Sequence, residues 1–568
     1  SQPKGLPLWQ FVCVFLILPT FDFRLCSTMD PLTVISFLLF TGLVAVLTWR
    51  LTRGRLDDTE EGFFLAGRSL TGVVIAGSLL LTNLSTEQLV GLNGGAFKDG
   101  LAVMAWEVIA GASLVVLALF FLPRYLKSGI TTVPQFLEER YGPGTRALTT
   151  FIFIIAYMLI LLPFVLFLGA KGLNGMLNLE EMLGLSEIGT IWVVIIFIGI
   201  VGSAYAIFGG LRAVAVSDTF NGVGLLVGGL MITFFAFRAA AGDGSFADAF
   251  AQLKEDKPEN LKSIAGEGHP LHWPTLFTGV LLLNFFYWTT NQQIIQRTFA
   301  AKNLAEGQKG VLLASFFKIL APLILILPGL LAYQIFVNDP DVDVSTVKDG
   351  NVYGMLVREV LPNWLTGFFA AVVMGSILST FNSVLNSSAT LFSLGVYKKI
   401  IKPAATQHEL VRSGRICSAV VAVLAIIAAP LIFHGRDGLF NMFQALNGIY
   451  FIPILAIMLF GFFNRTSAGI TAIIAIVIGV IAMLIGTFFH GGDEGWLKAI
   501  FGSGFHYMGA VFAFLILLQY VLGRSVRSTV PYVQQDAKVV DLTPWKHAKL
   551  VGIGLIVLVL ILYALFAV

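Results

Sequence analysis

The stretch GSLLLTNLSTEQLVG, residues 77–91, decides the fold. It lies inside an apolar run that is long enough to cross a bilayer, yet Asn83, Ser85, Glu87 and Gln88 stand at its centre. Polar side chains in hydrocarbon cost free energy, and a continuous helix gains nothing from such a cluster. A broken helix does gain, because its unwound carbonyls can coordinate a cation while its side chains reach a solute. The stretch therefore predicts an interrupted membrane helix.

The composition of the whole chain agrees with a membrane protein. Of 568 residues, 57% are hydrophobic and 12% are charged, whereas an average soluble domain has roughly 25% charged residues. The net charge of +3 is too small to indicate a nucleic-acid partner. The three cysteines have no CxxC spacing, so neither a disulfide framework nor a zinc site is indicated. Composition predicts an all-α integral membrane protein whose surroundings are the lipid bilayer, and no protein partner can be inferred from it.

Fourteen apolar runs are candidate transmembrane helices. They lie near 31–50, 70–95, 100–123, 147–170, 189–208, 213–237, 275–296, 310–336, 364–397, 414–433, 438–462, 466–489, 506–523 and 548–568. Runs two to six and runs seven to eleven form two sets of five. Because each set has an odd number of spans, the two sets insert upside down relative to each other. Inverted repeats with broken spans in corresponding places are typical of secondary transporters.

These runs divide the chain into predicted units. Residues 1–28 form an N-terminal extension, because their apolar run is too short to span. The other units are a peripheral first helix with a cytoplasmic loop (29–69), repeat one (70–237), an extracellular loop (238–274), repeat two (275–462) and three peripheral C-terminal helices (463–568).

The distribution of Lys and Arg predicts the orientation of the chain. If both termini lie outside, the cytoplasmic loops hold 23 Lys and Arg and the outer loops hold 10. An excess of positive charge inside is the usual pattern of membrane proteins. The N- and C-termini are therefore expected to be extracellular or periplasmic.

Three further ionisable residues lie deep inside predicted spans. They are Glu107 in the third, Asp218 in the sixth and Lys318 in the eighth. Such residues are functional candidates because their burial is costly. A buried ion pair between Glu107 and Lys318 is the structural alternative.

Carboxamides and aromatic rings accompany these charges. Asn284, Tyr287 and Trp288 lie in the seventh span and Gln444 in the eleventh. Interhelical hydrogen bonds and an interfacial aromatic belt are the structural alternatives for these residues. A mixture of carboxylate, ammonium, carboxamides and rings also suits a neutral polyol. Its hydroxyls both donate and accept, and its apolar face can lie on a ring.

The ninth span, MGSILSTFNSVLNSSAT at 374–390, carries a stripe of hydroxyls. Ser376, Ser379, Thr380 and Ser383 follow the spacing of one helix face. Such stripes often only pack helices or bond back to a carbonyl. Opposite a broken helix, however, they supply several oxygen ligands without a full charge, which suits a hard monovalent cation. Sodium is the predicted coupling ion.

Five motifs resemble the solute:sodium symporter family. They are FFLAGRSL (63–70), TNLSTEQLVGLNGGAF (82–97), YAIFGGLRAV (205–214), NFFYWTTNQQIIQRTFAAKN (284–303) and NSSATLF (386–392). The likeness covers about 50–530 and is strongest to the bacterial sodium/galactose and animal sodium/glucose cotransporters. It implies a LeuT-type core of two inverted five-helix repeats, with sodium and a sugar near the midplane. The short linker 524–547 is similar to bacterial members, which implies a bacterial inner membrane.

The resemblance also implies binding residues, position by position. The sugar contacts are Gln88, Glu107, Asn284, Lys318 and Gln444, with Tyr287 closing the site from the cytoplasmic side and Trp288 beside it. Asn83, from the polar centre of the second span, is a further predicted solute residue. The sodium ligands are the carbonyls of Leu81, Leu84 and Ser376 and the hydroxyls of Ser379 and Thr380. A second sodium would lie near Asp218, with Ser379, Asn382 and Ser383. Trp106 and Ala110 depart from the Tyr and Ser of the bacterial galactose transporter, which leaves the preferred epimer open.

The resulting prediction is sodium-coupled symport of a neutral hexose, glucose or galactose or both, by alternating access. Inositol or another polyol is the alternative solute. An integral-membrane enzyme is disfavoured because HExxH and GxSxG are absent from the sequence. A channel is disfavoured because no filter loop or charged ring is visible.

Overall fold

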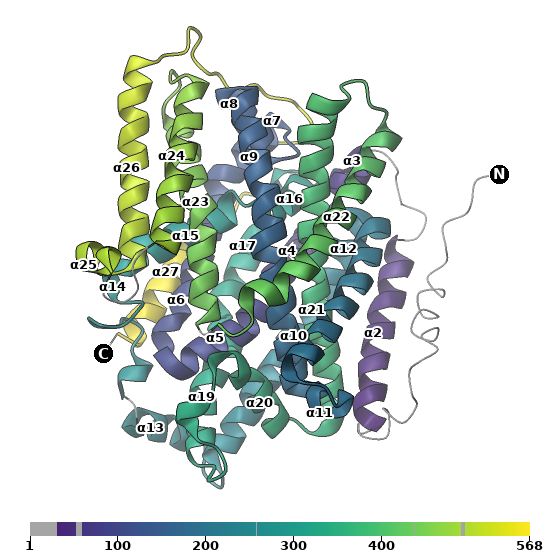
Figure 1. The fold of residues 1–568 in the computed structure, drawn as a ribbon, viewed down its shortest axis with the longest axis vertical. Coiled ribbons are helices and arrows are strands. Elements are labelled where there is room, and N and C mark those ends of the chain that lie inside the picture. The colour runs from purple at the N-terminus through teal and green to yellow at the C-terminus, as the bar shows by residue number, and fades with distance from the viewer. Residues whose placement is uncertain (1–30, 53–59, 257, 437, 490–494, 568) are drawn as a thin grey trace, which may run out of the picture.

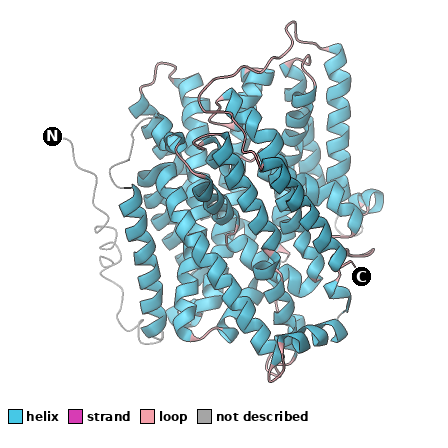
Figure 2. Ribbon diagram, turned by 180° about the vertical axis from the view of Figure 1, so that it is seen from behind, coloured by secondary structure: helices cyan, strands magenta, loops and turns pink. Residues whose placement is uncertain are grey.

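The computed structural model describes residues 31–52, 60–256, 258–436, 438–489 and 495–567. The predicted N-terminal extension at 1–28 lies outside these ranges. Figures 1 and 2 show that the described part of the chain is helical, and it holds isolated β-bridges but no named strand. This confirms the all-α prediction.

The helices of the first half are α2 (Pro31–Thr52), α3 (Glu60–Leu65), α4 (Gly72–Asn83), α5 (Thr86–Asp99), α6 (Ala105–Val116), α7 (Leu122–Ser128), α8 (Val133–Tyr141), α9 (Pro143–Ala156), α10 (Leu162–Leu177), α11 (Leu179–Leu183), α12 (Glu187–Ala241) and α13 (Phe246–Asp256). Those of the second half are α14 (Trp273–Thr275), α15 (Leu281–Thr289), α16 (Gln292–Phe299), α17 (Leu304–Leu320), α18 (Pro322–Leu325), α19 (Leu327–Val337), α20 (Asp349–Val360), α21 (Asn363–Thr390), α22 (Gln407–Phe433), α23 (Leu439–Phe463), α24 (Gly469–Phe488), α25 (Trp496–Phe501), α26 (Gly504–Ser525) and α27 (Ala548–Leu565). Short 3-10 or π-helical segments join several of them, among them η4 (Leu117–Phe121), η7 (Leu276–Val280) and η9 (Leu391–Ile401).

The described helices can be compared with the fourteen predicted spans. Ten are long and apolar enough to cross a membrane, or twelve if each of two bent helix pairs counts as one span. The other two predicted runs coincide with the apolar helix Glu187–Ser203 and with the helical run from α14 to α15. The 55 residues of α12 contain both the fifth and the sixth predicted runs, as the apolar stretches Glu187–Ser203 and Leu211–Ala241. The count of fourteen stays a prediction.

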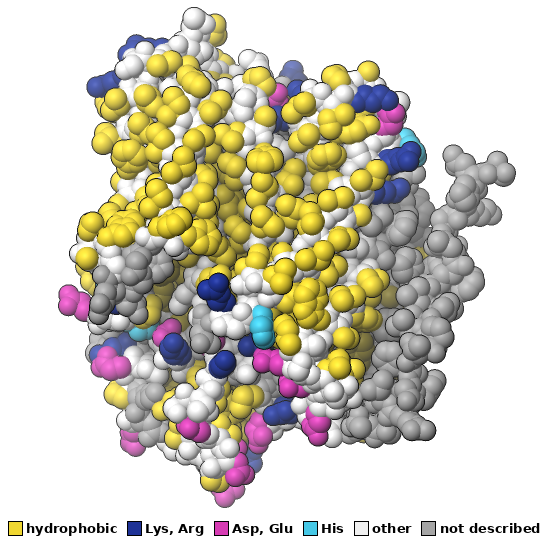
Figure 3. Space-filling model, in the orientation of Figure 1, with side chains coloured by type: hydrophobic (Ala, Val, Ile, Leu, Met, Phe, Trp, Pro, Cys, Tyr) yellow, Lys and Arg dark blue, Asp and Glu magenta, His cyan; other side chains and the backbone are white. Residues whose placement is uncertain are grey.

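Charge and apolar surface separate on the outside of the bundle. Figure 3 shows a broad band of hydrophobic side chains, with charged residues gathered beyond its two ends and acidic ones mostly at the lower end. Figure 1 shows α3, α7 and α8, from predicted cytoplasmic loops, near the upper end, whereas α11, α13 and α20, from predicted outer loops, are at the lower end. The alternation of loops read from the sequence therefore corresponds to two opposite ends of the bundle.

The second predicted span is interrupted where its polar cluster lies. α4 and α5 meet at an angle of 58°, with Leu84 and Ser85 in non-helical conformations between them. Asn and Ser side chains compete with the helical hydrogen-bond ladder, which favours a break at such residues. The seventh span is also interrupted, because α15 ends at Thr289 and α16 begins at Gln292. The first span of each five-helix set is thus broken near its middle.

Two glycines let the helices that carry charged residues approach closely. A Cβ at Gly111 of α6 would lie 2.5 Å from the Ile319 side chain of α17, and Ser315 donates to the Gly111 carbonyl at 2.8 Å. A Cβ at Gly77 of α4 would lie 2.9 Å from Thr219 Oγ1 of α12. The first contact brings Lys318 beside Glu107, and the second brings Ser78 beside Asp218.

Candidate functional site

A small cavity opens between the broken helix pair and its neighbours. It has about 30 Å³ of water-accessible space, roughly enough for one water molecule. Seven of the eight predicted solute residues line it: Asn83, Gln88, Glu107, Asn284, Tyr287, Trp288 and Gln444. They come from five separate helices, α4, α5, α6, α15 and α23. The structure therefore brings together residues that lie up to 361 positions apart in the sequence.

Lys318, the eighth predicted residue, lies behind this wall. Its side chain is fully buried, and its Nζ donates to Glu107 Oε2 and to Asn83 Oδ1. The ammonium also lies 5.5 Å from the centroid of the Trp288 ring. A cation in contact with a carboxylate, an amide oxygen and a π face is well compensated for its loss of water. In this conformation Lys318 holds two wall residues in place.

The carboxamides and the tyrosine of the wall keep free hydrogen-bonding capacity. Asn284 donates to the Val280 carbonyl at 3.1 Å, so its Oδ1 is left for other donors. Gln293 donates to the Tyr287 hydroxyl at 3.2 Å. This bond links Tyr287, which is predicted to close the site from the cytoplasmic side, to the break between α15 and α16. Gln88 Oε1 is buried and has no partner among the described residues. A polyol hydroxyl could satisfy these groups.

Three further cavity residues bear on solute choice. Glu87 lines the cavity and is buried, and its Oε2 has no hydrogen-bond partner within the described residues. Trp106 and Ala110, the two departures noted in the sequence, also line the cavity. The Trp106 ring packs on Phe440 at 5.5 Å and on Phe505 at 5.9 Å. No role for Glu87 could be predicted from the sequence, whereas its position on the wall makes it a candidate solute contact.

The predicted sodium carbonyls are the ones that the break releases from helical pairing. In a continuous helix Ser85 N would bond to Leu81 O, but it donates to Asn83 O at 2.8 Å instead. Gln88 N donates to Ser85 O at 3.0 Å rather than to Leu84 O. The oxygens of Leu81 and Leu84 therefore remain available at the kink, and unwound carbonyls of this kind suit an alkali cation.

The predicted hydroxyl ligands face this kink from α21. Thr380 donates to the Thr82 carbonyl at 2.9 Å, so α21 packs directly against the end of α4. Ser379 Oγ is buried and has no hydrogen-bond partner among the described residues. A buried hydroxyl without a partner costs free energy, and a bound cation would offset that cost. Ser376 Oγ instead bonds back to the Val373 carbonyl at 2.8 Å, and the prediction for Ser376 concerns its carbonyl oxygen.

A fully buried arginine lies beside the predicted second sodium residues. Arg297 donates to Ser78 Oγ at 3.0 Å, to Gln293 O and to Ser383 Oγ. Ser78 in turn donates to Asp218 Oδ2 at 2.8 Å, so a single hydroxyl links the guanidinium to the carboxylate. Asn382 Oδ1 is buried and has no partner among the described residues. Arg297 directly follows the predicted span 275–296, so the loop count includes it among the cytoplasmic cations. The polar run that contains Gln293 was the signal in the sequence that it belongs to the core.

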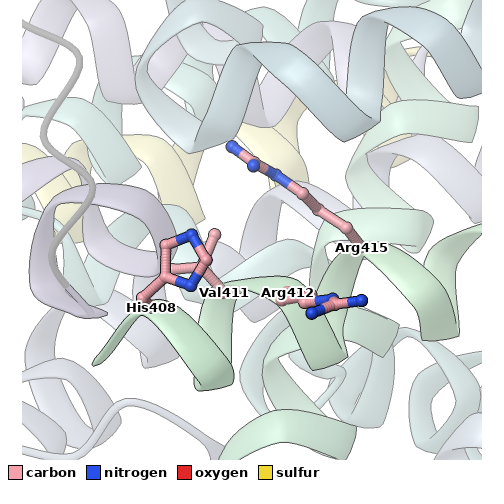
Figure 4. Close-up of a pocket in the computed structure, with 4 residues that line it drawn as sticks. All are labelled: His408, Val411, Arg412 and Arg415. Atoms are coloured by element: carbon pink, nitrogen blue, oxygen red, sulfur yellow. The ribbon is translucent and has the colours of Figure 1, made fainter. Parts of the chain in front are cut away.

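A second cavity of about 270 Å³ lies at the start of α22, lined by His408, Val411, Arg412 and Arg415. Figure 4 shows the guanidinium groups of Arg412 and Arg415 directed away from each other. The cavity shares no residue with the central one. Seven of the eight predicted solute residues line the central cavity, and none lines this second one.

The sequence matches the model of the sodium:solute symporter family over residues 63–479, nearly three quarters of its length. The chain belongs to this family. It is 43% identical over 539 residues to an uncharacterized symporter, YidK, of Escherichia coli, with 94% of this chain and 91% of the relative covered. It is 32% identical over 471 residues to a sodium/glucose cotransporter of Vibrio parahaemolyticus, with 79% and 84% covered. Members of this family are sodium-coupled transporters and not enzymes, so the chain is a multi-pass secondary transporter coupled to sodium.

The fold has a solved counterpart. A sodium-coupled sialic acid symporter in an outward-open, substrate-bound state superposes with a TM-score of 0.73 at 17% identity, covering 89% of this chain and 99% of that chain. At such identity the match concerns the fold alone. It confirms the predicted LeuT-type core.

Proposed function

We propose that this sodium-coupled transporter carries a neutral hexose, glucose or galactose or both, into a bacterial cell across its inner membrane. The observation that carries the proposal is the central cavity. Its wall combines a carboxylate held by Lys318, carboxamides with free capacity, and the Trp288 and Tyr287 rings. Hydroxyls that each donate and accept need this mixture, and an apolar sugar face suits a ring. Inositol, another polyol, is the alternative solute.

Sodium is coupled to the sugar through the break in the second span. We propose that one sodium binds the carbonyls of Leu81, Leu84 and Ser376 and the hydroxyls of Ser379 and Thr380. Binding there would hold α4 against α21 and so fix two residues on the cavity wall: Asn83, one residue before Leu84, and Gln88, four residues after it. Each ligand then raises the affinity of the other by the same factor. One charge moving through 100 mV gains about 2.3 kcal/mol, which supports roughly 40-fold accumulation of a neutral solute.

We do not propose that a second sodium binds at Asp218, Asn382 and Ser383. Ser383 Oγ already accepts a hydrogen bond from Arg297. Asp218 is linked to the same guanidinium through the hydroxyl of Ser78. A sodium ion at this position would have to share these oxygens with a buried cation, which Coulomb repulsion disfavours. We therefore propose a stoichiometry of one sodium per sugar.

Uptake into proteoliposomes tests the proposal. Labelled glucose and galactose should accumulate under an inward sodium gradient with an inward-negative potential, and accumulation should saturate. Myo-inositol added as a competitor distinguishes the alternative solute. Equal uptake with and without sodium would contradict symport, and failure of both hexoses with strong inositol uptake would contradict the proposed solute.

The proposed orientation has its own measurement. Single cysteines at Ser345, in a predicted outer loop, and at Ser528, in a predicted inner loop, would replace exposed side chains. In intact cells a membrane-impermeant thiol reagent should label the first and not the second. The reverse pattern would contradict the proposal that both termini lie outside.

A further inference from the structure

Two histidines far apart in the sequence meet beside the helix that leads to the central cavity. His272 directly precedes α14, and His506 lies in the first turn of α26. Their Nε2 atoms are 3.2 Å apart, and their rings are nearly perpendicular at 84°. Both side chains are half-buried, so they are held in place and still reached by water.

The hydrogen bonds around the pair are compatible with a His506 tautomer that carries its proton on Nδ1. The Thr278 hydroxyl can then donate to the Pro274 carbonyl at 3.2 Å and accept from His506 Nδ1 at 2.9 Å. With its proton on Nδ1, His506 presents the lone pair of Nε2 toward His272. Metal-binding histidines are commonly oriented in this way, by a hydrogen bond from the ring nitrogen that does not bind the metal.

The spacing of the two nitrogens suits a metal ion. Two ligands at 2.0–2.1 Å from a tetrahedral zinc ion lie about 3.3 Å apart, close to the 3.2 Å between the two Nε2 atoms. If the His272 proton moves from Nε2 to Nδ1, the hydrogen bond between the rings is lost. The lone pairs of both Nε2 atoms then point toward the same position. Among the described residues no third His, Cys, Asp or Glu joins the pair, so water would complete the coordination.

We propose that His272 and His506 form a binding site for a divalent transition-metal ion of the zinc and nickel class. Imidazole nitrogens are preferred ligands of these ions. With only two protein ligands the site would bind reversibly and would not be needed for folding. It differs from the sodium site in its ligands, its place in the fold and the hardness of its ion.

The position of the pair links a bound metal to transport. From His272 the chain continues through α14 and η7 into α15, which carries Asn284 and Tyr287. On the other side Phe505, next to His506, packs on Trp106 of the cavity wall. A metal bridge would fasten this helical run to α26 and restrain the movement that alternating access requires. This consequence rests on the proposed function, whereas metal binding itself does not.

Equilibrium dialysis of tag-free purified protein against zinc tests the binding. We expect about one zinc per chain for the wild type and at least tenfold weaker binding for His272→Ala and His506→Ala. His506→Phe, which keeps a ring at this position, serves if the alanine variant does not purify as a monodisperse protein. His408→Ala, an exposed histidine on α22, is the matched control and should bind as the wild type does. Thr278→Val should weaken binding about tenfold, because it removes the partner of His506 Nδ1.

Equal zinc binding by the wild type and His506→Ala would overturn the site, as would no binding by the wild type. If the bound metal restrains transport, zinc should slow hexose uptake by the wild type and by the His408→Ala variant. Uptake by His506→Ala should be unaffected by zinc. Zinc bound with unchanged uptake would overturn the link to transport. A protein that binds zinc but takes up no hexose would refute the proposed function and leave the metal site intact.

Discussion

Replacing Lys318 by alanine removes the cation that holds Glu107 and Asn83 on the cavity wall. Each of these wall residues would offer a sugar one hydrogen bond, worth about 0.5–1.5 kcal/mol. Losing the correct placement of both costs about 1–3 kcal/mol of solute binding, which is about a 5- to 150-fold rise in the apparent KM. The same substitution leaves a buried carboxylate without its partner, which costs about 3–5 kcal/mol of stability.

These two effects can be separated with a second variant. Lys318→Met combined with Glu107→Gln removes both charges, so it should recover most of the stability lost by Lys318→Ala. It should not recover hexose uptake, because the ammonium that orients the wall is still missing. The assays are thermal unfolding of the detergent-purified protein and the KM of sodium-driven uptake in proteoliposomes. A double variant with wild-type uptake would refute the assignment of this pair to the solute site and leave it a structural ion pair.

Three further predictions concern sodium and solute choice. Ser379→Ala should weaken the apparent sodium affinity about tenfold, whereas Ser388→Ala on the same helix, whose hydroxyl bonds back to a carbonyl, should not change it. The sodium dependence of uptake should have a Hill coefficient near one, because Arg297 already donates to Ser383, and a coefficient near two would contradict the proposed stoichiometry. Ala110→Ser adds a hydroxyl to the cavity wall and should change the ratio of galactose to glucose uptake about 2- to 10-fold, while an unchanged ratio would show that this position does not contact the solute.

The sequence predicted the broken second span because a local competition decides it. Asn83 and Ser85 offer the backbone alternative hydrogen bonds where the membrane supplies none, and the structure places the kink between α4 and α5 at these residues. The break at 290–291 in the seventh span carries a similar signal, since Asn291 and Gln292 lie there. Local polarity located the first interruption, whereas no break at 290–291 was predicted. The polar stretch 376–388 lies in the continuous helix α21, so polarity alone does not decide where a span is broken.

The burial of Arg297 could not be predicted from the sequence. Counting Lys and Arg by loop treats every cation near a span end as solvated, which is right for most of them. Whether a particular guanidinium is buried depends on partners from elsewhere in the chain, here Ser78 of α4 and Ser383 of α21. These partners lie 219 and 86 residues away, and no local pattern records them.

The role of Lys318 could be predicted only in part from the sequence. Its depth in the eighth span made it a functional candidate, but depth alone does not say whether it contacts solute or supports residues that do. The close approach of α17 to α6 at Gly111 brings the ammonium onto Glu107 and Asn83, so in this conformation it is withdrawn from the cavity. A transporter that must release its solute gains from this arrangement, because a cation bound to the protein can orient neutral ligands without holding them as a direct charged contact would. The charge in the core is then compensated within the protein, and the solute meets mainly groups whose single hydrogen bonds are weak enough to break in each cycle.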